Sequence, residues 1–204
     1  LGGHLYEPQE ENPMLGFRGA SRYKDKKFSD CFKSECDAFK RVRNDMGLIN
    51  AQVMIPFVRT TQEAEKVIKI LASRGLVSKK GGLQIYMMCE IPSNVILAEE
   101  FGEIFDFFSI GSNDLAQFVF GIDRDNEDIS AIADERHRAF TKTLEGLFEK
   151  TRAAGIPGGI CGQGPSLYPE LTSFLLEQGI ESISVMTDAI PRTIELILNI
   201  QEKF

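Results

Sequence analysis

The chain has 204 residues and a formal net charge of −7, with 43% hydrophobic and 26% charged residues. This length supports one sizeable hydrophobic core, and the acidic balance argues against a nucleic-acid-binding surface, which has to be basic. No apolar run is long enough to cross a membrane and the first residues lack a secretory signal, so we expect a cytoplasmic protein that binds neither nucleic acid nor membrane.

The first part of the chain is predicted to be irregular over residues 1–25, where glycine and proline are frequent and apolar runs are few. Residues 28–46 are predicted to form a helix, because apolar side chains recur every three or four positions in a charged segment. The sequence does not begin with methionine, and we expect it to be part of a longer protein.

Short apolar runs then alternate with helical patterns. In chain order, strands are expected at 50–58, 84–89, 107–110, 158–161 and 182–185. Helices are expected at 61–74, 94–101, 114–120, 134–154, 168–178 and 190–201. Nearly continuous apolar strands that alternate with helices predict an α/β fold with a parallel sheet. The pattern does not distinguish an open doubly wound sheet from a barrel.

Two of these strands end in carboxylates. Glu90 follows the strand at 84–89, and Asp114 closes the sequence Gly-Ser-Asn-Asp after the strand at 107–110. The carboxyl ends of parallel strands meet at one edge, where α/β folds place their chemistry. Two carboxylates there suit a hard cation such as Mg²⁺. Both side chains are also of the kind that caps helices or pairs with arginine, and spacing alone does not decide between these roles.

A third strand ends at Cys161, which lies between glycines. A thiol in this place is accessible to a substrate and could be a nucleophile or a general acid or base. A free cysteine is also commonly a small buried hydrophobe, and the residues alone favour that second interpretation. Cys89 is expected in the core, and Cys31 and Cys36 are expected to pack their helix. The four cysteines follow no disulfide spacing, which predicts reduced thiols.

Arginines are the third group of candidate site residues. Arg18, Arg22, Arg59 and Arg124 each lie in or beside a loop, and the planar arginine fork suits phosphate and carboxylate ligands. Arg18 is the best placed by sequence, because the glycines beside it let a ligand approach the backbone closely.

Five motifs occur in order along the chain and together carry a family resemblance. They are NPMLGFRG at 12–19, MMCEIPS at 87–93, SIGSND at 109–114, GIDR at 121–124 and GICGQGPS at 159–166. Over nearly its whole length the chain resembles the C-terminal part of the phosphoenolpyruvate-utilising enzymes. Within that family it is most similar to the phosphoenolpyruvate synthase (pyruvate, water dikinase) branch.

The resemblance implies a (β/α)₈ barrel of the TIM type that binds pyruvate or phosphoenolpyruvate. With five strands predicted, residues 1–204 would form a partial barrel domain with about the last five of its eight β/α units. The resemblance further implies that Glu90 and Asp114 bind Mg²⁺ and the substrate. Cys161 would be the catalytic residue that exchanges a proton at the methyl carbon of pyruvate.

Other residues are implied to bind the substrate directly. Gly111, Ser112 and Asn113 would contact it, and Arg124 would lie near its phosphoryl group. Arg18 is a further candidate for substrate binding, because its glycine neighbours let a ligand approach closely. Two further arginines that grip the phosphoryl group in the family belong to early barrel strands that this sequence lacks.

The parent reaction implied by the resemblance converts ATP, pyruvate and water into AMP, phosphoenolpyruvate and phosphate. It uses a phosphohistidine domain of the parent protein as a partner, and the barrel domain is the one that forms a homodimer. We therefore expect this chain alone to be inactive. Two alternatives stay open: the same domain of a phosphate-dependent dikinase or another phosphotransferase, and a non-catalytic remnant used for dimerisation or binding.

Overall fold

A single parallel sheet organises the computed structural model, which describes residues 7–201. Its strands are β1 (Val53–Ile55), β2 (Ile85–Cys89), β3 (Phe107–Gly111), β4 (Gly158–Cys161) and β5 (Ser182–Ile183). Their order in the sheet is their order along the chain. A doubly wound sheet reverses its order at a switch point, whereas successive strands are neighbours in a β/α barrel. The predicted α/β barrel arrangement is therefore confirmed, as five strands of an open sheet.

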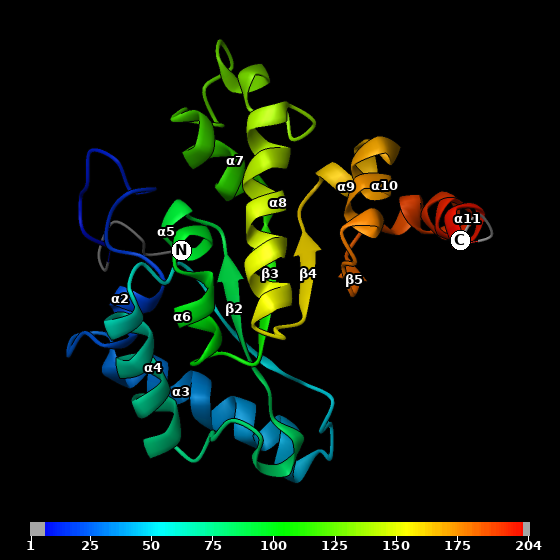
Figure 1. The fold of residues 1–204 in the computed structure, drawn as a ribbon. Helices are drawn as coiled ribbons and strands as arrows, with labels where there is room; N and C mark the ends of the chain where they lie inside the picture. Colours follow the sequence, from blue (N-terminus) through cyan, green and yellow to red (C-terminus); the bar gives the residue numbers. More distant parts are fainter. Residues whose placement is uncertain (1–6, 202–204) are drawn as a thin grey trace.

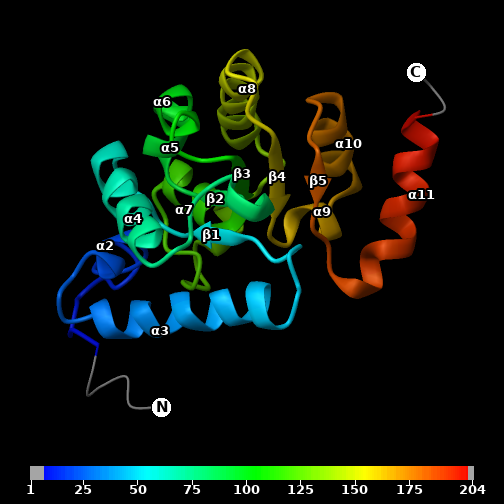
Figure 2. The same ribbon diagram turned by 90° about the horizontal axis from the view of Figure 1, so that it is seen from below.

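Helices connect each strand to the next. They are α4 (Thr61–Ser73), α5 (Pro92–Ile96) and α6 (Ala98–Gly102), α7 (Ser112–Phe120) and α8 (Arg138–Ala153), α9 (Gly164–Leu167) and α10 (Pro169–Glu177) and, after β5, α11 (Ile190–Gln201). Figure 1 shows α8 packed along the sheet beside β3 and β4. In Figure 2, α4, α6, α8 and α10 follow one another along one side of the sheet.

One predicted helix is divided into two, and two others are present close to their predicted bounds. The helix predicted at 94–101 breaks at Leu97, whose backbone leaves the helical region (φ −106°, ψ 32°). The helix predicted at 168–178 is α10, which begins at Pro169 because proline disfavours a helical backbone in the preceding Tyr168 (φ −123°, ψ 97°). The helix predicted at 61–74 is present, and its N-cap is Thr60, which accepts a hydrogen bond from the backbone of Glu63.

The core lies between the sheet and these helices. In β2, Ile85, Met87 and Cys89 point into it and are fully buried, whereas Tyr86 and Met88 lie on the opposite face and are half-buried. Among the described residues, the largest fully buried side chains on the helices are Leu71, Phe101, Leu115, Phe140, Leu144 and Leu147. The prediction that Cys89 is a core residue is confirmed.

The segment before β1 covers the β1 end of the sheet. It contains α2 (Ala20–Tyr23) and α3 (Ser29–Lys40), and the predicted helix at 28–46 ends as a π-helical turn, η1 (Arg41–Asp45). Residues 1–25 were expected to be irregular, and the short helix α2 contradicts this expectation at residues 20–23. Residues 1–6 lie outside the described part of the chain. Arg59 donates hydrogen bonds to the backbone carbonyls of Gly16 (2.6 Å) and Arg18 (3.2 Å), which ties this segment to the end of β1.

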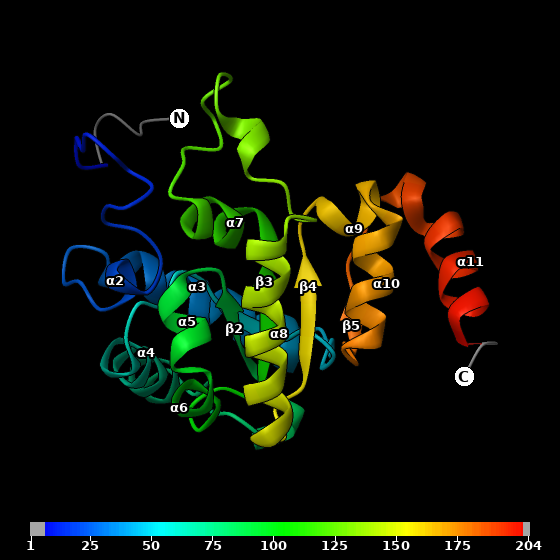
Figure 3. The same ribbon diagram turned by 45° about the horizontal axis from the view of Figure 1, so that its top comes forward.

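The loops that follow β2, β3 and β4 lie at the carboxyl edge of the sheet (Figure 3). Figure 3 shows the carboxyl ends of β2, β3 and β4 pointing to the side occupied by α7 and by the loop that precedes α8. Short 3₁₀ turns lie at Lys80–Gly82, Ser130–Ile132 and Thr187–Ala189. Among residues 7–201, no helix combines the length and the apolar character needed to cross a membrane.

Candidate active site at the carboxyl ends of the strands

Three neighbouring strands bring the predicted site residues to one edge of the sheet. Cys89 pairs with Ile110 in the register of β2 and β3, so Glu90 follows its strand beside the end of β3. Gly111 pairs with Cys161 in the register of β3 and β4. The expectation that these strand ends lie together is therefore met by the parallel register.

Glu90 is held in a buried position, with 5% of its surface exposed. Its Oε1 accepts a hydrogen bond of 2.7 Å from the backbone N–H of Phe57, at the end of β1. Phe57 adopts φ 52°, a left-handed conformation that is unusual for a bulky residue. Burial raises the pKa of Glu90 to about 7, and the nearby carboxylate of Asp114 adds to the effect while the Phe57 N–H opposes it.

Asn94, rather than Glu90, caps the helix that follows β2. Its side-chain Oδ1 accepts hydrogen bonds from the backbone N–H groups of Glu90 (3.2 Å) and Ile91 (3.3 Å), and its Nδ2 donates to the carbonyl of Val58 (2.7 Å). This fully buried amide fixes the ends of β1 and β2 relative to each other. The carboxylate of Glu90 is consequently left for another role.

Asp114 lies in the first turn of α7 between two arginines. Its Oδ1 is 3.3 Å from Nη1 of Arg124, and its Oδ2 is 4.0 Å from Nη2 of Arg18. The buried Oδ1 nevertheless makes no hydrogen bond, because the Arg124 contact is not aligned as one. The guanidinium of Arg18 also stacks on the ring of Phe57 at 4.2 Å, and that of Arg59 on the same ring at 4.7 Å.

Cys161 is half-buried at the end of β4, with its Sγ 3.7 Å from Sδ of Met88. Burial raises the pKa of its thiol, and the carboxylates of Glu90 and Asp114 add to this while Ser109 opposes it. The sulfur therefore keeps its proton at neutral pH. This arrangement suits a general acid better than a poised nucleophile.

The loop between β3 and α7 presents its backbone to the site. Ser112 is fully buried, and its Oγ lies 3.1 Å from the carbonyl of Cys161 and 3.2 Å from Oε1 of Glu135. Its side chain is thus engaged with protein, which leaves its backbone for a substrate. The N–H groups of the first turn of α7, at Asn113 and Asp114, have no partner within the helix and suit an anion.

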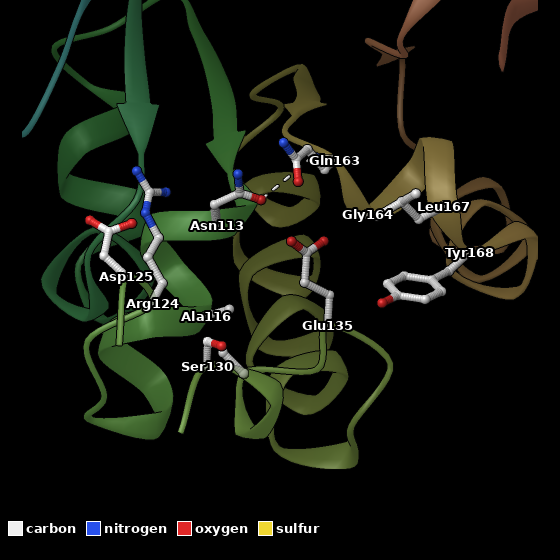
Figure 4. Close-up of a pocket in the computed structure, with 11 residues that line it drawn as sticks. Asn113, Ala116, Arg124, Asp125, Ser130, Glu135, Gln163, Gly164, Leu167 and Tyr168 are labelled. Atoms are coloured by element: carbon white, nitrogen blue, oxygen red, sulfur yellow. Dashed lines mark hydrogen bonds between the residues drawn. The ribbon is translucent and has the colours of Figure 1, made fainter. Parts of the chain in front are cut away.

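A cavity of about 450 Å³ opens beside this loop. Its polar lining residues come from α7, the loop before α8 and the segment after β4, and they are Asn113, Arg124, Asp125, Ser130, Glu135, Gln163 and Tyr168. Figure 4 shows the carboxyl group of Glu135 directed between Asn113 and Gln163. Sequence reasoning missed Glu135, since it lies in a polar loop with no motif of its own and its burial depends on the folded chain.

The donor set at the strand ends fits one hard cation. Among residues 7–201, no cluster of three or more histidine, cysteine or acidic side chains could hold a metal ion. Mg²⁺ does not need such a cluster, because it is usually bound through one or two carboxylates with waters and substrate oxygens. The two carboxylates are mutually repulsive, and the buried Oδ1 of Asp114 lacks a hydrogen bond. A cation would relieve both features.

Comparison with known proteins gives a family model that covers almost the whole chain. The model describes a PEP-utilising enzyme, PEP-binding domain, and matches residues 3–202. The chain is 55% identical over 190 residues to the phosphoenolpyruvate synthase of Pseudomonas aeruginosa (strain UCBPP-PA14), which covers 93% of this chain and 24% of that protein. It is 52% identical over 193 residues to that of Escherichia coli (strain K12), covering 95% and 24%. The chain spans about a quarter of the length of these relatives.

Proposed function

Because the chain belongs to the phosphoenolpyruvate-utilising enzymes, as their phosphoenolpyruvate-binding domain, we propose that it is the C-terminal substrate-binding domain of a phosphoenolpyruvate synthase. The parent reaction would convert ATP, pyruvate and water into AMP, phosphoenolpyruvate and phosphate through a phosphohistidine. The observation that carries this proposal is the meeting of Glu90, Asp114 and Cys161 at three neighbouring strand ends. The similarity to phosphoenolpyruvate synthases favours water over phosphate as the co-substrate.

The two carboxylates are the residues that would hold Mg²⁺. When bound, this ion supplies a Lewis acid for the developing enolate oxygen. Glu90 is oriented for the task by the Phe57 N–H, and Asp114 by its place in the first turn of α7. The same turn offers the backbone N–H groups of Asn113 and Asp114 to the carboxylate of pyruvate.

Cys161 would exchange the proton at carbon. When phosphoenolpyruvate is consumed, the thiol would give its proton to the methylene carbon of the enolate, and the thiolate remains. In synthesis the thiolate would take a proton from the methyl carbon of pyruvate, and the enolate oxygen would then receive the phosphoryl group. The raised pKa of the thiol favours the protonating direction within this chain.

Arg124 and Arg18 would act on the phosphoryl side of the substrate. Arg124 lines the cavity beside Asn113 and is partly exposed, and Arg18 lies nearest the other carboxylate oxygen of Asp114. Planar guanidinium groups bind phosphate through paired hydrogen bonds. Both arginines now face the carboxylate of Asp114, so they are placed to change partners when a charged ligand arrives.

The remaining parts of the parent protein would complete this half-site. We propose that preceding strands close the barrel along the open sheet, and that they bring the additional arginines. A phosphohistidine domain would supply the phosphoryl group, and the protein would act as a homodimer. We place it in the cytoplasm, where thiols such as the four free cysteines stay reduced.

A chimera tests the proposed function. The C-terminal quarter of the Escherichia coli relative, which aligns with this chain at 52% identity, is replaced by residues 1–204. The proposal predicts that the chimera forms phosphoenolpyruvate and AMP from pyruvate and ATP. A folded chimera that still makes its phosphohistidine but no phosphoenolpyruvate contradicts the proposal. Glu149→Gln, which alters an exposed side chain of α8, is the matched control.

A further inference from the structure

Glu135 is a buried acid between two loops of the site. It lies in the segment before α8 with 7% of its surface exposed. Its Oε1 is 3.2 Å from Oγ of Ser112, and its Oε2 is buried without a hydrogen-bond partner. On its other side it meets Gly164, where a Cβ atom would stand 1.7 Å from Oε2. The carboxyl group thus fills the space between the ends of β3 and β4.

The hydrogen bonds of the Ser112 hydroxyl group depend on whether the carboxyl group of Glu135 carries a proton. It has one proton to donate and lies within hydrogen-bond distance of two acceptors, the carbonyl of Cys161 (3.1 Å) and Oε1 of Glu135 (3.2 Å). Both contacts are hydrogen bonds only when Glu135 is the neutral acid, because it then donates to Ser112 while Ser112 donates to the carbonyl. Burial also favours this state, since it raises the pKa of Glu135, with Ser112 opposing and Asp134 adding to the effect.

We propose that Glu135 is a positioning residue, whose neutral carboxyl group donates to Ser112 and so holds the substrate loop (residues 111–114) against the thiol loop (residues 161–164). The two loops are packed too closely for side chains at their contact. A Cβ atom at Gly162 would lie 2.1 Å from Oγ of Ser112. The hydrogen-bonded chain from Glu135 through Ser112 therefore fixes the carbonyl of Cys161 and, with it, the exposure of the thiol.

This coupling reaches beyond the proposed function. The effect of this coupling on proton exchange rests on the proposed function. The link between the two loops does not rest on it, and this link is measurable without any ligand. The thiol of Cys161 reports on it directly, because alkylation requires an exposed thiolate. Cys36 and Cys89 are buried and report on global unfolding in the same sample.

The experiment measures alkylation by iodoacetamide at pH 6.5, where the neutral acid of Glu135 is favoured more than at alkaline pH, followed by mass spectrometry, in a Cys31→Ser background that removes the exposed thiol. Glu135→Ala is expected to speed modification of Cys161 about fivefold, the size expected for one lost hydrogen bond. Glu135→Gln should stay close to the parent rate, because its amide still donates to Ser112. Cys36 and Cys89 should remain unmodified in both variants. They should also remain unmodified in the control variant Glu149→Ala.

A second variant keeps the test decisive if Glu135→Ala unfolds. Ser112→Ala removes the middle of the chain and should speed modification of Cys161 to a similar degree. The double variant Ser112→Ala with Glu135→Gln should then react no faster than Ser112→Ala alone. An unchanged Cys161 rate in folded Ser112→Ala or Glu135→Ala overturns the proposal. So does a Glu135→Gln rate as fast as that of Ser112→Ala, since the ionised carboxylate would then be what matters.

Discussion

The backbone N–H of Phe57 donates a 2.7 Å hydrogen bond to Oε1 of Glu90 and thereby connects the end of β1 to the carboxylate after β2. Phe57 reaches this position in a left-handed conformation, which costs a non-glycine residue about 1–2 kcal/mol. Packing sustains it, since the side chain is 2% exposed and lies against the guanidinium groups of Arg18 and Arg59. Backbone strain of this kind is found where a site must be preorganised.

Gly19→Ala should disturb this arrangement. Gly19 has φ 63°, and a Cβ atom there would lie 2.3 Å from Cβ of Phe57 and 2.6 Å from the carbonyl oxygen of Pro56. Gly179→Ala is the matched control, because Gly179 has φ 80° but open space around it. The control should lose about 1 kcal/mol from left-handed strain alone. Gly19→Ala should lose about 1–3 kcal/mol more, measured by urea unfolding, and equal losses would contradict this packing account.

The stability of the chain without divalent cations should fall as the pH rises through about 7. The pKa of Glu90 is raised from 4.5 to about 7 in the folded state. Between these values the folded chain holds a proton that the unfolded chain releases, so folding is favoured at the lower pH and this advantage is lost above pH 7. Urea midpoints at pH 5.5 and pH 8 measure the effect, which is on the order of 1–3 kcal/mol.

Glu90→Gln isolates the contribution of this carboxyl group, because the other titrating groups are unchanged. Its unfolding midpoint should depend less on pH than that of the parent chain. Adding Mg²⁺ at pH 8 should raise the midpoint of the parent and leave that of Glu90→Gln almost unchanged. Identical pH profiles for the two proteins would show that Glu90 is not the group responsible.

Cys161→Ser should separate binding from proton exchange. In the chimera with the Escherichia coli relative, this variant should still form the phosphohistidine from ATP. It should lose the exchange of methyl protons of pyruvate with deuterated water by at least about 100-fold, the usual contribution of a general acid or base. The exchange is followed by NMR of pyruvate. Retention of exchange in Cys161→Ser would assign the proton transfer to another group.

The 204-residue chain alone should form no AMP from ATP and pyruvate. It spans about a quarter of the length of its relatives, and its proposed role covers only the pyruvate half of the reaction. Chromatographic assay of AMP, with the chimera as the positive control, checks this expectation. AMP formation by the purified chain above the rate of a Cys161→Ser sample would refute it.

The strand ends were the most predictable part of the site. A short apolar run followed by a polar residue is visible in sequence, and a parallel sheet brings such strand ends to one edge. The pairing of Gly111 with Cys161 is set by the register of the folded sheet. The strands themselves are shorter than their apolar runs, as at β1, where three of the nine residues predicted at 50–58 pair with β2. Hydrophobicity marks burial, whereas a strand also requires a hydrogen-bonding neighbour.

What the sequence did not reveal depends on contacts between distant segments. The conformation of Phe57 and the burial of Glu135 arise only when β1, β2 and the loop before α8 come together. Cys31 was expected to pack its helix but is exposed, whereas Cys36 is buried, because periodicity defines a face without fixing its width. For Asp114 the sequence left open whether it pairs with an arginine or belongs to a cation site. It pairs with Arg124 and also lies at the candidate cation site.

The proposed Mg²⁺-dependent binding of pyruvate at the strand ends is tested most directly by an NMR titration of the isotopically labelled chain with oxalate, a mimic of the pyruvate enolate, in the presence and absence of Mg²⁺. We expect Mg²⁺-dependent shifts of the backbone amides of residues 111–114 and of Cys161, and the loss of these shifts in Glu90→Gln. Weak binding still satisfies this prediction, because the test is which residues respond and whether they require the cation. Shifts that are independent of Mg²⁺, or that spare residues 111–114 and Cys161 in a folded sample, would contradict it.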